Sequence, residues 1–312
     1  MNRLIANAPL KGIIPPLVTP LSDNDTLDTA GLENLIERLI AGGVHGLFIL
    51  GTTGEAQSIS YNLRRRMIEE TSRINGRRLP LLVCISDTSI TESINLANIA
   101  AGCGADAVVS APPYYYAPSQ EELAGFYHDL ADRLPLPLFL YNMPSHTKVS
   151  FAPGTVRRIA EHKNVIGFKD SSANAVYFQS VLTAMAGRPD FSMMVGPEEM
   201  TAEIVLMGGH GGINGGANLF PGLYVNLYHA AVAGNLEEVR RLQKIVMLIS
   251  TTLYTVGKYG SSYLKGVKCA LGLLGVCNDH LAAPCYKFEE PEKERIREAL
   301  NHLQFTIRPF TI

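Results

Sequence analysis

The feature that most constrains the fold of this chain is a regular alternation of short apolar runs with longer helical patterns. The apolar runs are rich in Val, Ile and Leu and do not alternate with polar residues, which is typical of strands buried on both faces of a parallel sheet. The expected strands are 12–19, 44–50, 80–86, 107–111, 137–141, 165–169, 191–195 and 211–213. The helices expected after them lie near 28–41, 60–75, 90–102, 119–133, 153–162, 174–186, 198–207 and 221–232. These eight β-then-α units predict an α/β fold, a (β/α)8 TIM barrel, rather than an open doubly wound sheet.

The pattern changes to helices alone after residue 233. The expected helices are 236–254, 262–274 and 291–303, with no low-complexity linker before them. We therefore expect a barrel over 1–233 and a C-terminal helical extension over 234–312 that packs on it. No G-x-G-x-x-G motif opens a helix after the first strand, which weakens the alternative of a dinucleotide-binding domain.

The charge balance argues against two classes of partner. The chain has 27 Lys and Arg against 29 Asp and Glu, a formal net charge of −2. Nucleic acids and anionic membranes reward clustered positive charge, so we expect neither as a partner. The one basic run, Arg64-Arg65-Arg66, lies inside a helical pattern and is expected to be an exposed helix face. No run of about 18 apolar residues occurs, and the amino terminus is too polar for a signal peptide, so we expect a cytoplasmic protein.

Neither the cysteines nor the histidines show the spacing of a metal site. The five cysteines contain no C-x-x-C pair and are best interpreted as small buried residues. The histidines at 45, 128 and 210 are scattered along the chain. We expect no metal and no cofactor.

Reactive residues are expected where the strands end, because a barrel of this type carries its active site at the C-terminal ends of its strands. Lys169 follows the apolar run 165–168. Its amine is therefore expected to point toward the barrel mouth from surroundings that exclude water. Desolvation disfavours the ammonium ion and lowers the pKa of a lysine. A neutral amine can then attack a ketone and form an imine. Taken alone, Lys169 could equally reach solvent or pair with Asp170.

Two further strand ends add groups that suit this chemistry. Tyr141 ends the preceding strand, and a phenol there can move protons as a carbinolamine forms and dehydrates. A strand tyrosine is nevertheless most often a core residue. Thr52 and Thr53 lie in the turn GTTGE at 51–55, whose N–H groups and hydroxyls could hold a carboxylate. Gly and Thr are also common in simple turns from strand to helix.

Five segments together resemble the dihydrodipicolinate synthase/N-acetylneuraminate lyase family. They are GTTGE at 51–55, YYYAPSQEEL at 114–123, LYNMPSHT at 140–147, IGFKDSS at 166–172 and GGHGGINGGANLFP at 208–221. They occur in the family's order, and the helical tail also suits the family. Together they are specific for the family and much less so for the substrate.

The resemblance implies a class I, metal-independent aldolase that acts on a small-molecule substrate. It implies that Lys169 is the Schiff-base lysine and that Tyr141 is its proton-shuttling partner. Thr52 and Thr53 would bind the carboxylate of the pyruvoyl group, and Thr53 would also join a hydroxyl relay.

Four more positions match the family. Tyr115 matches a tyrosine that reaches into the neighbouring subunit's site, which implies a homo-oligomer, at least a dimer and typically a dimer of dimers. Ile213 matches the position whose carbonyl lies near the lysine. Gly196 matches a glycine of the seventh-strand loop beside the substrate, and Ser171 matches a hydroxyl position used by sugar-acid aldolases.

The chain departs from the dihydrodipicolinate synthases after the fifth strand. Those enzymes carry an arginine there, which holds the carboxylate of aspartate semialdehyde, whereas this chain has His146. A neutral histidine would lose a charge-assisted contact of ~1.5–3 kcal/mol. Lys148 could take over that role, and His146 could also be an ordinary polar loop residue.

The loop after the seventh strand carries Glu198 and Glu199. In sialic-acid lyases, acidic residues here hydrogen-bond sugar hydroxyls, and either glutamate could do the same. They could equally be first-turn acids that stabilise the following helix.

The leading hypothesis is a lyase that reversibly cleaves a 2-oxo acid to pyruvate and an aldehyde. A 2-keto-3-deoxy sugar acid or a sialic-acid-like compound would be the substrate. A second hypothesis is 4-hydroxy-tetrahydrodipicolinate (dihydrodipicolinate) synthase, which condenses pyruvate with aspartate semialdehyde. A third is a dehydratase that uses the same imine, and a fourth is a non-catalytic pyruvate-binding barrel.

Overall fold

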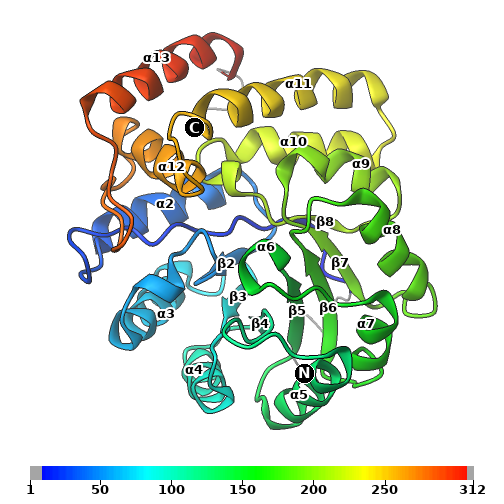
Figure 1. Cartoon of the computed structure of the whole chain (residues 1–312). Helices are drawn as coiled ribbons and strands as arrows, with labels where there is room; N and C mark the ends of the chain where they lie inside the picture. Colours follow the sequence, from blue (N-terminus) through cyan, green and yellow to red (C-terminus); the bar gives the residue numbers. More distant parts are fainter. Residues whose placement is uncertain (1–8, 308–312) are drawn as a thin grey trace.

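Eight parallel strands form one sheet in the computed structural model, which describes residues 9–307 (Figure 1). The strands are β1 (Gly12–Ile13), β2 (Leu47–Ile49), β3 (Leu81–Cys84), β4 (Ala107–Ser110), β5 (Leu138–Asn142), β6 (Val165–Asp170), β7 (Ser192–Val195) and β8 (Gly211–Gly212). Their order in the sheet is β1-β8-β7-β6-β5-β4-β3-β2. A parallel bridge between Pro16 and Phe48 joins the segment after β1 to β2, so the sheet closes on itself. The predicted (β/α)8 TIM barrel is confirmed.

Helices surround this sheet. The longer ones that follow the strands are α2 (Thr29–Ala41), α3 (Tyr61–Asn75), α4 (Ile90–Gly102), α5 (Gln120–Arg133), α7 (Pro153–Ile159), α8 (Ala175–Ala184), α9 (Thr201–Leu206) and α10 (Pro221–Val232). Four short helices were not predicted separately: η1 (Ala56–Ser58), α6 (Pro144–Thr147), η2 (Glu198–Met200) and η3 (Gly215–Asn218). Each of these follows the C-terminal end of a strand, where a barrel carries its active site.

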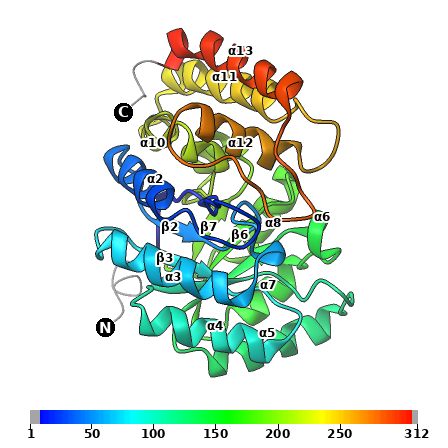
Figure 2. The ribbon, with the colours of Figure 1, turned by 90° about the vertical axis from the view of Figure 1, so that its left-hand side faces the viewer.

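Three helices complete the chain: α11 (Leu236–Leu253), α12 (Ser262–Leu273) and α13 (Glu290–Ile307). Helix α11 packs on α10 and α13, and α12 contacts both α13 and η3. Figure 2 shows α11, α12 and α13 gathered on one side of the molecule, beyond α2 and β2. Because η3 follows β8, this packing brings α12 to the end of the barrel that carries the predicted site.

Local features of the sequence explain why these strands and helices form where they do. Strands β2 to β7 are buried on both faces, as their apolar runs predict. Ser119 begins α5 with a capping box, in which the Ser119 hydroxyl and the Glu122 carboxylate each accept a backbone N–H. A Cβ at Gly167 would lie 2.1 Å from the Phe139 ring, so β6 needs glycine there to pack against β5.

Two details differ from the sequence expectations. Strand β1 is much shorter than the predicted 12–19, because Pro15 and Pro16 have no N–H to donate to a neighbouring strand. The segment over 198–207 is divided into η2 and α9 instead of forming one helix. Within residues 9–307, no helix combines the length and the apolar character that a bilayer crossing requires.

Candidate active site

Lys169 lies near the C-terminal end of β6 in a dry environment. Its side chain is 4% exposed, and its amine lies 4.1 Å from the centroid of the Tyr141 ring and 4.8 Å from that of Phe48. Loss of hydration lowers the pKa of this amine from 10.5 to about 7. A large fraction of Lys169 is therefore uncharged at neutral pH, as a nucleophilic amine must be.

Asp170, the carboxylate that could have paired with Lys169, has other partners. It accepts hydrogen bonds from the Asn142 side chain and the Ser172 hydroxyl, both at 2.8 Å. Asn142 ends β5, so this contact also ties β5 to β6 beside the amine. The alternative in which Lys169 forms an ion pair with Asp170 is wrong.

Tyr141 pairs with Lys169 in the register of β5 and β6. Its hydroxyl lies 3.2 Å from that of Thr52, and burial raises its pKa to about 12. Tyr141 therefore keeps its proton at neutral pH and has a second hydroxyl with which to exchange it. The hydroxyl beside Tyr141 belongs to Thr52, and the relay role expected of Thr53 stays a prediction.

The turn at 51–55 is held by backbone hydrogen bonds within it. The N–H groups of Gly54 and Glu55 donate back to the carbonyls of residues 51 and 52, at 3.0 and 3.1 Å. Over residues 9–307, the N–H groups of Thr52 and Thr53 have no hydrogen-bond acceptor. Leu50 and Glu55 flank the turn with φ of 59° and 55°, in the left-handed region that L residues rarely adopt. Such backbone costs ~1–3 kcal/mol per residue and persists only where surrounding contacts hold it.

A buried ion pair supplies one of those contacts. Lys268 of α12, whose side chain is fully buried, pairs with Glu55 and donates to the His280 carbonyl at 2.6 Å. The other Glu55 carboxylate oxygen accepts the N–H of Ala282 at 2.8 Å. Burial lowers the pKa of Lys268, and the charge of Glu55 opposes that shift. The C-terminal helices thus hold the end of the turn.

The same helix brings a phenol to the turn. The hydroxyl of Tyr263 in α12 lies 3.2 Å from that of Thr53. A Cβ at Gly215 would lie 1.5 Å from the Tyr263 hydroxyl, so the phenol fits against η3 only because residue 215 is glycine. Burial raises the pKa of Tyr263, which therefore stays protonated.

Glu198 is buried beside this phenol. One of its carboxylate oxygens accepts the hydroxyls of Tyr224 and Tyr254, both at 2.6 Å, and the other accepts the N–H of Gly216 at 2.7 Å. Burial raises the pKa of Glu198 to about 7, although these three donors stabilise the carboxylate and act to lower the pKa.

Glu199 also has partners within the protein. Its carboxylate accepts the Ser250 hydroxyl at 2.5 Å, and its backbone carbonyl accepts the Gln243 side chain at 2.6 Å. The expectation that Glu198 or Glu199 faces the hydroxyls of a sugar is therefore corrected, because both carboxylates have donors within the protein. Those donors come from α10, from α11 and the residue after it, and from η3.

The other predicted binding residues lie together at the strand ends. Ser171 follows β6, Gly196 follows β7 and Ile213 follows β8. A Cβ at Gly196 would lie 2.1 Å from the Ser171 hydroxyl, so the two loops approach closely because residue 196 is glycine. Ile213 is buried and donates its N–H to the Val195 carbonyl at 2.8 Å.

Tyr115 and His146 lie at the surface around the site. Tyr115 is 79% exposed and packs edge-on against Tyr116, with ring centroids 5.0 Å apart. His146 is in α6, and partial burial of its ring, together with the charge of Lys148, lowers its pKa, so the imidazole is neutral at pH 7. The Lys148 ammonium donates to the Ser145 carbonyl at 2.6 Å.

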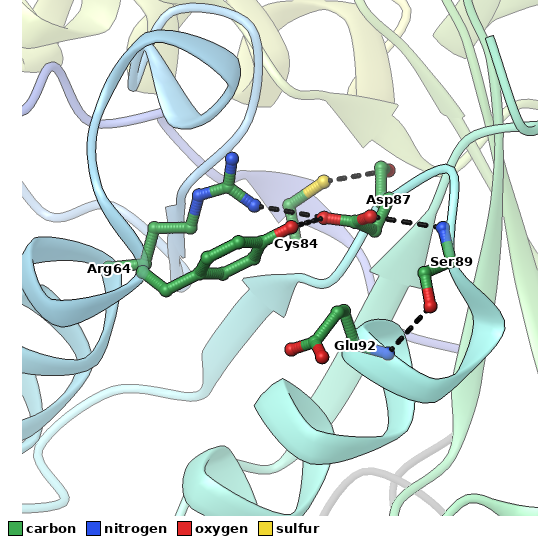
Figure 3. A network of polar contacts seen from close by, with 7 residues as sticks. Arg64, Cys84, Asp87, Ser89 and Glu92 are labelled. Carbon is green, nitrogen blue, oxygen red and sulfur yellow. Dashed lines mark hydrogen bonds and ion pairs between the residues drawn. The ribbon is translucent and has the colours of Figure 1, made fainter. Parts of the chain in front are cut away.

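The loop after β3 carries a polar network that was not predicted (Figure 3). Arg64 of α3 is buried and pairs with Asp87 at 3.3 Å, and the Tyr61 hydroxyl donates to the same carboxylate oxygen at 2.8 Å. The backbone N–H of Ser89 donates to the other oxygen at 3.0 Å. The expectation of an exposed basic face is thus wrong for Arg64, although it is right for Arg65 and Arg66.

Three residues that build the site were missed by sequence reasoning. Phe48 lies within the predicted strand 44–50, and asking which strand residues line the barrel beside Lys169 could have found it. Tyr263 and Lys268 lie in a helix that follows the barrel, and no local spacing connects that helix to the turn at 51–55.

The arrangement suits one kind of chemistry. A buried uncharged amine, a protonated phenol with a hydroxyl neighbour and a turn with two unpaired N–H groups can together receive a 2-oxo acid and form an imine with its ketone. In the described part of the chain, no three His, Cys, Asp or Glu side chains gather as metal ligands do.

Known proteins similar to this chain belong to one family. The model of the Dihydrodipicolinate synthetase family matches residues 9–303. The 4-hydroxy-tetrahydrodipicolinate synthase of Methanopyrus kandleri is 32% identical over 94% of this chain and 96% of its own length. A solved structure of dihydrodipicolinate synthase from Bacteroides thetaiotaomicron is 68% identical, with a TM-score of 0.94 over 95% of this chain and 100% of the other. The Escherichia coli protein YagE, solved in complex with pyruvate, is 29% identical, with a TM-score of 0.90 over 95% and 99% of the two chains.

These likenesses show that the chain belongs to the Dihydrodipicolinate synthetase family and is an enzyme of that family's class, the class I lyases and synthases that form a Schiff base with a lysine.

Proposed function

We propose that Lys169 is the Schiff-base lysine and that the enzyme reversibly cleaves a 2-oxo acid to pyruvate and an aldehyde. The observation that carries this proposal is the buried amine of Lys169, with a pKa of about 7, against the ring of Tyr141. The structure of YagE in complex with pyruvate supports the choice of a pyruvoyl substrate.

The reaction begins at the ketone of the substrate. The neutral amine of Lys169 adds to C2, and Tyr141 passes a proton to the oxygen so that water leaves and an iminium ion remains. The proton of the C4 hydroxyl then moves to the relay of Tyr141 and Thr52 as the C3–C4 bond breaks and the aldehyde departs. The bonding electron pair moves to the iminium nitrogen and leaves an enamine. The relay then returns a proton to C3, and water hydrolyses the resulting iminium ion, which releases pyruvate, restores the amine and gives a proton back to Tyr141.

The remaining strand-end residues hold the substrate during these steps. The unpaired N–H groups and hydroxyls of Thr52 and Thr53 bind the carboxylate next to the ketone. Ser171, Gly196 and the Ile213 carbonyl, which follow β6, β7 and β8, are proposed to contact the rest of the substrate.

For the second half of the substrate we propose a 2-keto-3-deoxy sugar acid or a sialic-acid-like compound. His146 is neutral at pH 7 and offers no permanent charge to a second carboxylate. The Ser171 hydroxyl suits a hydroxylated chain instead. Because the carboxylates of Glu198 and Glu199 accept hydrogen bonds from donors within the protein, these residues do not contribute to this preference.

The second candidate is 4-hydroxy-tetrahydrodipicolinate synthase activity. Several curated relatives at 29–32% identity carry that name, among them the proteins of Methanopyrus kandleri and Thermodesulfovibrio yellowstonii. In this case Lys148 takes the place of the arginine that is expected after the fifth strand. Turnover of aspartate semialdehyde with pyruvate, measured beside cleavage of 2-keto-3-deoxygluconate, separates the two candidates.

We also propose that the enzyme works as a homo-oligomer. The exposed pair Tyr115 and Tyr116 is the kind of aromatic surface that subunit contacts bury. Sedimentation of the wild type and of a Tyr115→Ala variant tests this: a wild-type monomer contradicts it.

Borohydride trapping tests the central proposal. The protein is incubated with pyruvate, reduced, digested and analysed by mass spectrometry, and we expect one adduct, on Lys169. Lys169→Met should abolish the adduct, whereas Lys163→Met, a substitution outside the proposed site, should leave it unchanged. A folded wild-type protein without an adduct on Lys169 would overturn the proposal.

A further inference from the structure

Among the described residues of the C-terminal helices, Tyr263 is the one whose hydroxyl contacts a threonine of the turn at 51–55. Its oxygen lies 3.2 Å from the Thr53 hydroxyl, on the turn with two unpaired N–H groups. The proposed reaction steps give this phenol no role. Its protonated state makes it a hydrogen-bond donor, and a carboxylate can accept about four hydrogen bonds.

The surroundings hold this hydroxyl in place. The Tyr263 ring packs edge-on against Tyr254 with centroids 4.9 Å apart, and the Tyr254 hydroxyl is bound by the buried Glu198. On its other side the hydroxyl reaches the backbone at Gly215, where any side chain would displace it. A phenol fixed by a buried carboxylate cluster on one side and a required glycine on the other is preorganised for a ligand.

We propose that Tyr263 is a substrate-binding residue, whose phenol donates a hydrogen bond to the carboxylate of the pyruvoyl group beside Thr53. The inference rests on the proposed function and deepens it, because it makes the first carboxylate site incomplete without helix α12. The group that Tyr263 recognises is the carboxylate common to every 2-oxo acid substrate. The residue therefore contributes to pyruvate affinity and does not select the aldehyde.

The test compares Tyr263→Phe with Tyr127→Phe in the full-length protein. Tyr127 is a matched control, because it is a buried tyrosine whose hydroxyl donates to the Ser110 carbonyl at 3.0 Å, between α5 and β4. The fraction trapped by borohydride is measured against pyruvate concentration. The half-saturating concentration reports affinity, and the plateau reports the ability to form the imine.

We expect Tyr263→Phe to raise the half-saturating pyruvate concentration roughly ten- to a hundred-fold, the effect of losing a hydrogen bond to a charged group, with an unchanged plateau. Tyr127→Phe should stay within about two-fold of the wild type. Gly215→Ala, whose new methyl group would displace the Tyr263 hydroxyl, should shift the same concentration in the same direction. It carries the test if Tyr263→Phe does not fold.

Two results would overturn the inference. One is an unchanged half-saturating concentration in folded Tyr263→Phe, and the other is a lower plateau without a change in affinity. If the wild type itself traps no pyruvate, the proposed Schiff base fails and this inference fails with it. If the wild type traps pyruvate and Tyr263→Phe has the same half-saturating concentration, the inference fails while the proposed Schiff base stands.

Discussion

The amine of Lys169 lies 4.1 Å from the centroid of the Tyr141 ring, and the two residues are direct partners in the register of β6 and β5. Hydrogen bonding between the two strands therefore holds the proposed nucleophile and the proposed proton carrier side by side. The amine is buried at this position, and its loss of hydration lowers its pKa to about 7.

The pH dependence of imine formation should follow Lys169. Only the neutral amine is nucleophilic, and burial lowers its pKa to about 7. We expect the rate constant for trapping with pyruvate to rise as the pH increases through about 7 and to level off above it. Rates measured between about pH 5.5 and 9 check this. An increase that begins only near the ordinary lysine pKa would show that the amine is hydrated.

Tyr141→Phe should slow turnover by about 10²–10⁴-fold, the usual contribution of a positioned proton carrier. The ring remains, so the surroundings of Lys169 change little and imine formation should slow without disappearing. Steady-state kinetics and trapping on the same preparation separate the two effects. Tyr177→Phe is the control, because the Tyr177 hydroxyl donates to the Phe151 carbonyl at 2.7 Å. Equal losses in both variants would argue against a role for the Tyr141 proton.

Lys268→Met should destabilise the protein by about 3–5 kcal/mol, because it leaves the carboxylate of Glu55 buried without its cation. Adding Glu55→Gln should recover part of that loss by removing the unpaired charge. Urea unfolding followed by circular dichroism measures both variants. Arg65→Met removes an exposed pair with Glu69 and should change stability by less than about 1 kcal/mol. If Lys268→Met were as mild as Arg65→Met, the buried pair would not hold the turn.

His146→Arg should improve the use of aspartate semialdehyde. A guanidinium in α6 would supply the permanent charge that His146 lacks at neutral pH, which is expected to raise kcat/KM for a substrate with a second carboxylate by about ten- to a hundred-fold. Cleavage of 2-keto-3-deoxygluconate should improve less. Pyruvate consumption and release, measured for both substrates, check this. Equal effects on both would show that position 146 does not face the second carboxylate.

The barrel was predictable because its signals are local. Most strands lie in a continuous apolar run, and helix ends such as that of α5, at Ser119, carry their own capping residues. Lys169 and Tyr141 could be predicted for the same reason, because the position of a residue in its strand determines its place at the mouth. The division into a barrel over 1–233 and an extension over 234–312 stays a prediction.

The rest of the site depends on contacts between distant segments. Glu198 has the sequence pattern of an ordinary first-turn acid, and only the packing of α10 and α11 shows that tyrosine hydroxyls surround it. Arg64 has the pattern of a charged surface, and only the loop after β3 provides the carboxylate that allows its burial. Tyr263 lies far from Thr53 in sequence, so the pattern of either segment alone gives no sign that they meet.

The ion pair between Lys268 and Glu55 makes the turn at 51–55 depend on a helix that is synthesised late. The last helices of the chain leave the ribosome after all eight strands, so a nascent barrel has no finished catalytic centre until α12 arrives. Premature termination before that helix should therefore yield an inert product.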